Sequence, residues 1–139
     1  MSWLGWALLS AFFAAGTAIL AKIGVSEIDA NLATAIRTSI VVIFSWSIAF
    51  AARRPGSFQL PPGKTWLFLS LSGIATTLSW LSYFHALQVG PASRVAPIDK
   101  LSVVLVVIFA ALVLGERLTW GKAIGALLIS LGAIAVTLD

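Results

Sequence analysis

The sequence predicts an all-α membrane protein that crosses the bilayer with five helices. Of its 139 residues, 60% are hydrophobic and 10% are charged, and the mean hydropathy is +1.03. Soluble domains of this size carry less apolar sequence. Because one transmembrane helix needs about 20 apolar residues, five helices use about 100 residues and leave only short loops. We therefore expect no separate soluble catalytic domain.

Two spans are expected in the N-terminal half of the chain. No charged residue precedes Lys22, which predicts a first span over about residues 3–22. A cleaved signal peptide would instead begin with cations, so we interpret this span as retained. Residues 30–52 are apolar apart from Arg37 and predict the second span. Residues 53–64 contain three prolines, two glycines and three cations, which predicts the longest loop.

Three further spans are expected in the C-terminal half, so that residues 1–139 form one transmembrane domain. The third covers about residues 65–89 and ends before a Gly-Pro pair. The fourth covers about residues 93–115, with its charged residues and Pro97 in the first third. A Glu-Arg pair separates it from the fifth span, over about residues 118–138.

The charge and composition exclude several classes of function. A net charge of +4 and a pI of about 10.2 would suggest a nucleic-acid partner in a soluble protein. Here the cations are scattered between apolar runs, as in loops beside anionic lipid headgroups, so we expect no nucleic-acid binding. With no cysteine and one histidine, we expect no metal site and no cofactor. No arrangement of nucleophile and base predicts an enzyme.

The distribution of cations favours a cytoplasmic N-terminus. Five spans place the termini on opposite faces, and the face of the N-terminus then receives five of the nine cations. The other face receives four, or two if Arg37 and Lys100 are counted within their spans. The positive-inside rule therefore places the N-terminus inside, while the small bias leaves dual topology open.

Three local patterns resemble one family of membrane proteins. They are Tyr-Phe-His-Ala-Leu-Gln at residues 83–88, Leu-Gly-Glu-Arg-Leu at 114–118 and the glycine-bounded run at 125–132. Together with Lys22 and Arg37, their order and spacing resemble the EamA domain of the drug/metabolite transporter superfamily. The resemblance covers essentially the whole chain.

This resemblance implies one EamA-type repeat of five helices in the plasma or inner membrane. Most members carry two such repeats in tandem with opposite orientations, so it implies pairing as an antiparallel homodimer or with a second half-domain protein. The last helix is also similar to that of the small multidrug resistance proteins, where glycines seven residues apart lie in the dimer contact.

The function that the resemblance implies is secondary transport of small organic metabolites or drugs by alternating access, as an exporter. A second hypothesis is a flippase for lipids or lipid-linked head groups, or an accessory subunit of a membrane complex. Arg37 and Lys100 would then bind phosphate.

Asp99 and Lys100 are candidate substrate or coupling residues, because they lie about 10 Å inside the fourth span, where charge is expensive. Asp99 would be protonated or contact substrate, and Lys100 would bind an anion. Alternatively, the chain is non-helical up to Pro97 and both side chains reach the headgroups. Since adjacent helical residues point about 100° apart, we expect Asp99 to pair with Arg37, with Lys22 or with a group of the second protomer rather than with Lys100.

The third span carries an aromatic stripe at spacings of three and four residues, comprising Thr76, Trp80, Tyr83, Phe84 and Leu87. It suits a cavity for amphipathic or cationic organic substrates, or else helix packing or an interfacial belt. His85 is a candidate proton relay or a hydrogen-bonded residue near the interface. The first span has no acidic residue, unlike that of the small multidrug resistance proteins, which makes Asp99 and His85 the candidate proton sites.

Arg37 and three glycines complete the set of candidates. Arg37 lies seven residues into the second span, where it either binds an anionic group in an aqueous vestibule or extends to the nearer surface. Gly121, Gly125 and Gly132 allow close approach of another helix, from a second protomer or from the same chain.

Overall fold

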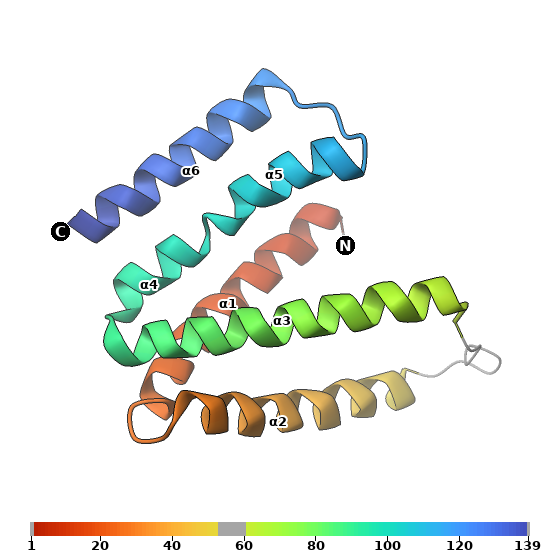
Figure 1. Cartoon of the computed structure of the whole chain (residues 1–139), viewed down its shortest axis with the longest axis vertical. Helices are drawn as coiled ribbons and strands as arrows, with labels where there is room; N and C mark the ends of the chain where they lie inside the picture. Colours follow the sequence, from red (N-terminus) through yellow and green to blue (C-terminus); the bar gives the residue numbers. More distant parts are fainter. Residues whose placement is uncertain (1, 53–60, 139) are drawn as a thin grey trace. The chain divides into compact units, whose positions relative to one another are not determined.

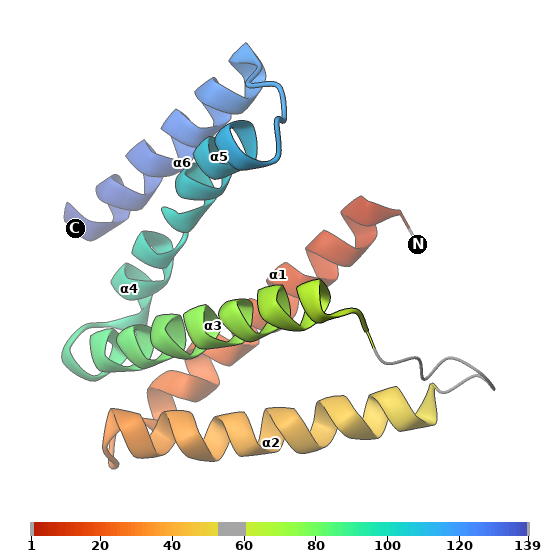
Figure 2. The same ribbon diagram turned by 45° about the vertical axis from the view of Figure 1, so that its right-hand side comes forward.

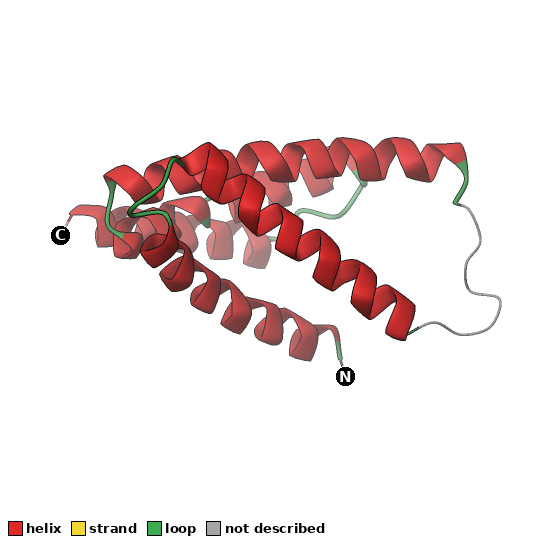
Figure 3. Ribbon diagram, turned by 90° about the horizontal axis from the view of Figure 1, so that it is seen from below, coloured by secondary structure: helices red, strands yellow, loops and turns green. Residues whose placement is uncertain are grey.

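The computed structural model describes residues 2–52 and 61–138. In these residues the chain is helical with short connections (Figures 1 and 3). The helices are α1 (Trp3–Gly24), α2 (Ala30–Ala51), α3 (Gly63–Val89), α4 (Ala92–Asp99), α5 (Ser102–Val113) and α6 (Trp120–Leu138). Because α4 and α5 together form one segment of membrane-crossing length, the described residues contain five such segments. The predicted all-α fold with five spans is confirmed.

The start of α2 is set by Asp29. Its Oδ1 accepts hydrogen bonds from the backbone N–H of Asn31 at 2.9 Å and of Leu32 at 3.2 Å, which satisfies donors that the first helical turn leaves free. These hydrogen bonds, chiefly the one from Leu32, favour the charged carboxylate and hold the pKa of Asp29 below its ordinary value of 3.8. The helix ends at Ala51. Most of the predicted loop that follows, residues 53–60, lies outside the described residues.

The fourth span differs from the single helix expected over residues 93–115. Pro97 has no N–H to donate to the carbonyl of Ser93, four residues earlier. The N–H groups of residues 100, 101, 103 and 104 then each donate to the carbonyl three residues earlier, at 3.0 to 3.1 Å. This tighter geometry separates α4 from α5 at Lys100 and Leu101. The alternative of a non-helical chain up to Pro97 was wrong, because residues 92–99 are helical.

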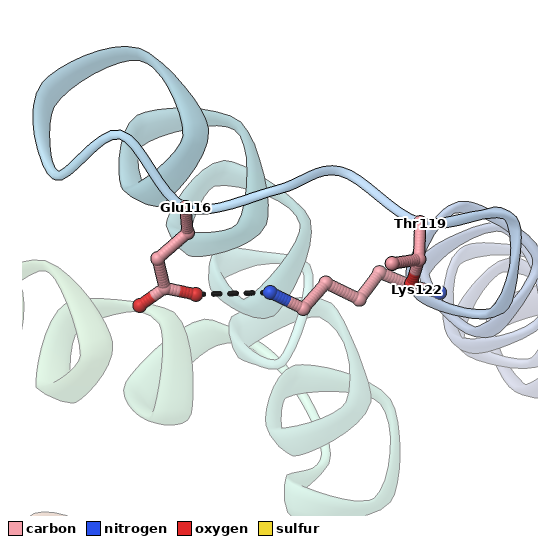
Figure 4. Close-up of polar contacts among 3 residues, drawn as sticks. All are labelled: Glu116, Thr119 and Lys122. Atoms are coloured by element: carbon pink, nitrogen blue, oxygen red, sulfur yellow. Dashed lines mark hydrogen bonds and ion pairs between the residues drawn. The ribbon is translucent and has the colours of Figure 1, made fainter.

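A glycine and a threonine set the connection between α5 and α6. Gly115 has a φ of +69°, in the left-handed region where a side chain is strained. The N–H of Glu116 then donates to the carbonyl of Ala110 at 3.1 Å. The Thr119 hydroxyl accepts from the N–H of Lys122 at 3.4 Å and caps α6, while Lys122 Nζ lies 3.0 Å from Glu116 Oε2 (Figure 4).

The chain divides into two compact units, residues 1–22 with 89–139 and residues 23–88. In the first unit, α4 and α5 pack beside α6 (Figure 2). Lys22 Nζ in this unit donates to the carbonyl of Gly90 at 2.9 Å.

In the second unit, α2 and α3 run in opposite directions, meet at the α1–α2 loop and diverge toward their other ends (Figure 3). The Gln88 side-chain amide donates to the carbonyls of Val25 at 3.3 Å and Ile28 at 2.7 Å, which ties the end of α3 to that loop. Val25, Ala30, Phe84 and Leu87 are buried around this junction.

Large apolar side chains are exposed along every span. On α1, for example, 73% of Phe12 and 63% of Phe13 is exposed. A soluble protein would bury such residues, whereas in a bilayer lipid covers them. The exposure therefore agrees with the membrane location that the composition predicts.

Candidate functional site

Arg37 of α2 lies against two aromatic rings of α3. Its guanidinium carbon is 4.0 Å from the centre of the Trp80 ring and 5.6 Å from the centre of the Phe84 ring. Both distances lie within the range of cation–π attraction, which strengthens where water is excluded. Trp80 and Phe84 are one helical turn apart and so present both rings on the same side of α3.

The surroundings of Arg37 contain no compensating carboxylate in its own unit. Among the described residues of that unit, Glu27 and Asp29 are the acids, and Arg37 forms an ion pair or hydrogen bond with neither. Its side chain is half-buried. Among the described residues of its own unit, the aromatic rings of Trp80 and Phe84 are the groups that attract the positive charge of Arg37.

The structure separates the remaining predicted residues of α3. The ring of Tyr83 is half-buried, with its centre 6.5 Å from that of Phe84, and Tyr83 interacts electrostatically with Arg37. His85 is exposed outside this cluster, and its charge contributes to the lowered pKa of the Asp29 carboxyl at the α1–α2 loop. Arg37, Trp80, Tyr83 and Phe84 therefore form one cluster, which we call the arginine–aromatic cluster, and His85 does not belong to it.

A groove of about 510 Å³ lies between α2 and α3. Five of its nine lining residues are polar, and Arg37 does not line it; the polar residues are Asn31, Thr34, Thr38, Ser39 and Thr77. The hydroxyls of Thr34, Thr38 and Ser39 donate to carbonyls four residues earlier on α2, at 2.7 to 3.0 Å. Their oxygen lone pairs can still accept hydrogen bonds from a ligand or water.

This groove was not predicted from the sequence. Its signal is the spacing of polar residues 31, 34 and 38, which places them on one side of α2. Hydroxyl residues are common in transmembrane helices because they bond their own backbone. The spacing therefore indicates a groove only once the structure shows that Thr77 of α3 lines the same space.

Asp99 and Lys100 form an ion pair with each other, with Lys100 Nζ 3.2 Å from Asp99 Oδ2. The prediction that these neighbours would not pair was wrong, because it assumed one continuous helix. Since α4 ends at Asp99 and Lys100 lies in the turn that follows, the two side chains can turn toward each other. The Lys100 side chain is 56% exposed and that of Asp99 is 37% exposed.

The glycines of α6 are not required for packing within their own unit. A Cβ at Gly125 or Gly132 would meet no atom within 4 Å, and one at Gly121 would meet only the Thr119 hydroxyl at 4.0 Å. Close approach of another helix to these glycines therefore stays a prediction.

These features define the class of protein. The described residues contain five apolar helical segments long enough to cross the membrane, which makes the chain a multi-pass membrane protein with an arginine inside one span. Comparison with known proteins then identifies its family.

The sequence profile of the EamA-like transporter family matches residues 1–138, and the chain belongs to this family. It is also 52% identical over 136 residues to a Sinorhizobium sp. protein described as an uncharacterized transporter in the cobO 3′ region, covering 96% of this chain and 94% of that protein. No solved structure matches the chain. The protein is therefore a membrane transporter, as the motifs predicted.

Proposed function

We propose that the protein exports small organic metabolites or drugs by secondary transport, with alternating access between the two faces of the membrane. The observation that best supports this proposal is the groove between α2 and α3, which is mostly apolar but carries an asparagine and four hydroxyl residues. An apolar lining with a few polar groups is typical of sites that bind small organic molecules. The volume of about 510 Å³ falls within the usual size range of sites for small molecules.

The proposed assembly is an antiparallel homodimer in the plasma or inner membrane. Alternating access commonly uses two repeats of opposite orientation that rock about a central site. The described residues of this chain contain one set of five apolar helical segments long enough to cross the membrane. A second copy, inserted the other way round, or a second half-domain protein would supply the missing repeat.

Export can be tested with purified protein in liposomes that are loaded with amino acids, nucleosides and organic acids. We expect mass spectrometry to find at least one solute released several-fold faster than from protein-free liposomes. Ser39→Leu fills the groove and should abolish this release. Ser47→Leu is the matched control, because Ser47 also lies on α2 and bonds its own helix at 2.8 Å but does not line the groove. Equal release by both variants would contradict the role of the groove.

The second candidate function is a flippase for lipids or lipid-linked head groups, or an accessory subunit. The observation that favours it is Arg37, a cation inside a span with no carboxylate partner among the described residues of its unit. A phosphate headgroup could bind there. If no water-soluble solute is released but fluorescent phospholipids equilibrate between the leaflets, the proposal of solute export is wrong and this alternative replaces it.

A further inference from the structure

We infer that Arg37 binds an oxyanion, so that the ligand of this protein is an organic carboxylate or phosphate. That this ligand is a transported substrate rests on the proposed function. That Arg37 binds an oxyanion does not depend on transport.

The guanidinium of Arg37 is held deep in the span. The Gln88 contacts show that the C-terminal end of α3 lies beside the α1–α2 loop, at the same end as the start of α2. Phe84 is nearer to that end than Trp80, and Trp80 lies nine residues, or about 13 Å, from the end of the helix at Val89. The guanidinium is 4.0 Å from the deeper ring and 5.6 Å from the shallower one. An arginine that extended to the nearer surface would pass Phe84 instead.

The contact with Trp80 leaves the edge of the guanidinium available. An aromatic ring interacts with the face of this planar group, whereas its five N–H donors lie in the plane. In the described part of its unit, no hydrogen-bond acceptor contacts these N–H groups. Every fully buried side-chain nitrogen of the described residues has a hydrogen-bond partner. Within the described part of this unit, these donors thus remain available to a ligand. Two parallel N–H groups fit the two oxygens of a carboxylate or phosphate.

The same contact excludes organic cations from the cluster. Arg37 already occupies one face of the Trp80 ring, and Phe84 is only 3% exposed. A second cation would meet a like charge inside a medium of low dielectric constant, where repulsion is strong. An anion with an apolar or aromatic body would instead pair with Arg37 and pack against half-buried Tyr83 and Trp80. Because of Arg37, we expect the aromatic residues of α3 to bind anionic rather than cationic ligands.

Equilibrium binding of radiolabelled benzoate to the full chain in phosphatidylcholine nanodiscs tests this inference. Benzylammonium, which has the same ring and the opposite charge, is the matched probe. We expect saturable binding of benzoate but not of benzylammonium, and binding about tenfold or more weaker in Arg37→Gln, since bonds to charged groups are the strong ones. Arg94→Gln is the control, because Arg94 is an exposed arginine of α4 outside the cluster.

Arg37→Lys keeps the inference testable if Arg37→Gln does not fold. It retains the positive charge but loses the planar fork, so benzoate should bind several-fold more weakly than to the wild type. Equal binding of benzoate by the wild type and by every folded Arg37 variant would overturn the inference, as would preferential binding of benzylammonium.

The source of the oxyanion is distinguished by adding phosphatidylglycerol to the nanodiscs. If the site takes water-soluble anions, benzoate binding stays saturable in its presence. If the site takes a lipid headgroup, phosphatidylglycerol displaces benzoate from the wild type, and spin-labelled phosphatidylglycerol quenches tryptophan fluorescence less in Arg37→Gln. Either result supports an oxyanion site at Arg37. Binding is measured independently of transport, so the two proposals can fail separately. If the protein releases solute but benzoate binding does not depend on Arg37, only the oxyanion inference is refuted. If benzoate binding depends on Arg37 but no solute is released, only the export function is refuted.

Discussion

Asp29 is a residue whose contribution to the fold depends on pH in a defined direction. Its carboxylate caps α2 through the N–H groups of Asn31 and Leu32, and these bonds hold its pKa below 3.8 in the folded protein. A depressed pKa means that the stabilisation is complete above the unfolded value and is lost as the pH falls through the lower, folded value. We expect the thermal midpoint in detergent to fall below pH 4 more steeply for the wild type than for Asp29→Ala.

The variant Asp29→Asn distinguishes the effect of the capping hydrogen bonds from the effect of the negative charge. Asparagine also accepts hydrogen bonds at an N-cap, so this variant should keep most of the wild-type midpoint at neutral pH, whereas Asp29→Ala should lower it. The asparagine variant should show no added loss of stability between pH 4 and pH 2. Identical acid profiles for all three proteins would show that Asp29 does not couple protonation to folding.

The candidate residues could be predicted individually, but their contacts could not. Arg37 stood out as a cation within an apolar run, and Trp80 and Phe84 stood out by their spacing. Which side of α2 faces those rings depends on how two helices are aligned, and no local pattern encodes this alignment. For Asp99 and Lys100 the error had a different origin, since a pairing rule for continuous helices was applied where the helix is broken.

At the scale of the elements, the break between α4 and α5 is the feature with the clearest link to transport. Broken helices in transporters place backbone groups at binding sites and allow the two halves to move. Pro97→Ala restores the donor missing at position 97 and should join α4 to α5. Because proline inside a helix costs about 3 kcal/mol, we expect the unfolding midpoint to rise and the rate of solute release to fall.

Pro91→Ala is the matched control for this prediction. Pro91 is the N-cap of α4, where a missing N–H costs little, so its replacement should leave both the midpoint and the release rate nearly unchanged. If Pro97→Ala raises the stability and releases solute at the wild-type rate, the break is a feature of the fold without a role in the transport cycle.

The helices were predictable to within a few residues because hydrophobic length and terminal signals agree. Asp29 before α2, two prolines before α3 and Gly115 after α5 each act through local geometry that a sequence displays. The division of the fourth span was not predicted. Pro97 marks a possible break, but whether the preceding turn stays helical depends on the hydrogen bonds that follow the proline.

At the scale of the whole molecule, the absence of native cysteine makes membrane orientation directly measurable. Ser2→Cys and Asp139→Cys can each be probed in intact cells with a membrane-impermeant thiol reagent. If copies insert in both orientations, as an antiparallel homodimer requires, both variants should be partly labelled, because five spans place the termini on opposite faces. Labelling of Asp139→Cys alone would fix the N-terminus in the cytoplasm and require an oppositely oriented partner protein.

The glycines of α6 provide a test of pairing that does not depend on orientation. Because a Cβ at Gly125 meets no atom within 4 Å, a side chain can leave the backbone there without displacing its nearest neighbours in the unit. If Gly125 instead faces the second protomer, the leucine side chain of Gly125→Leu prevents close contact between the helix backbones of the two protomers. We expect this variant to keep the wild-type thermal midpoint as a monomer while crosslinking of the dimer falls several-fold.

Leu127→Ala serves as the control, since Leu127 is an exposed residue of the same helix that lies outside the glycine series. Wild-type crosslinking in Gly125→Leu would place the protomer contact elsewhere. A loss of crosslinking together with a loss of solute release would mean that one repeat cannot complete the transport path, so that the second copy is part of the transport site.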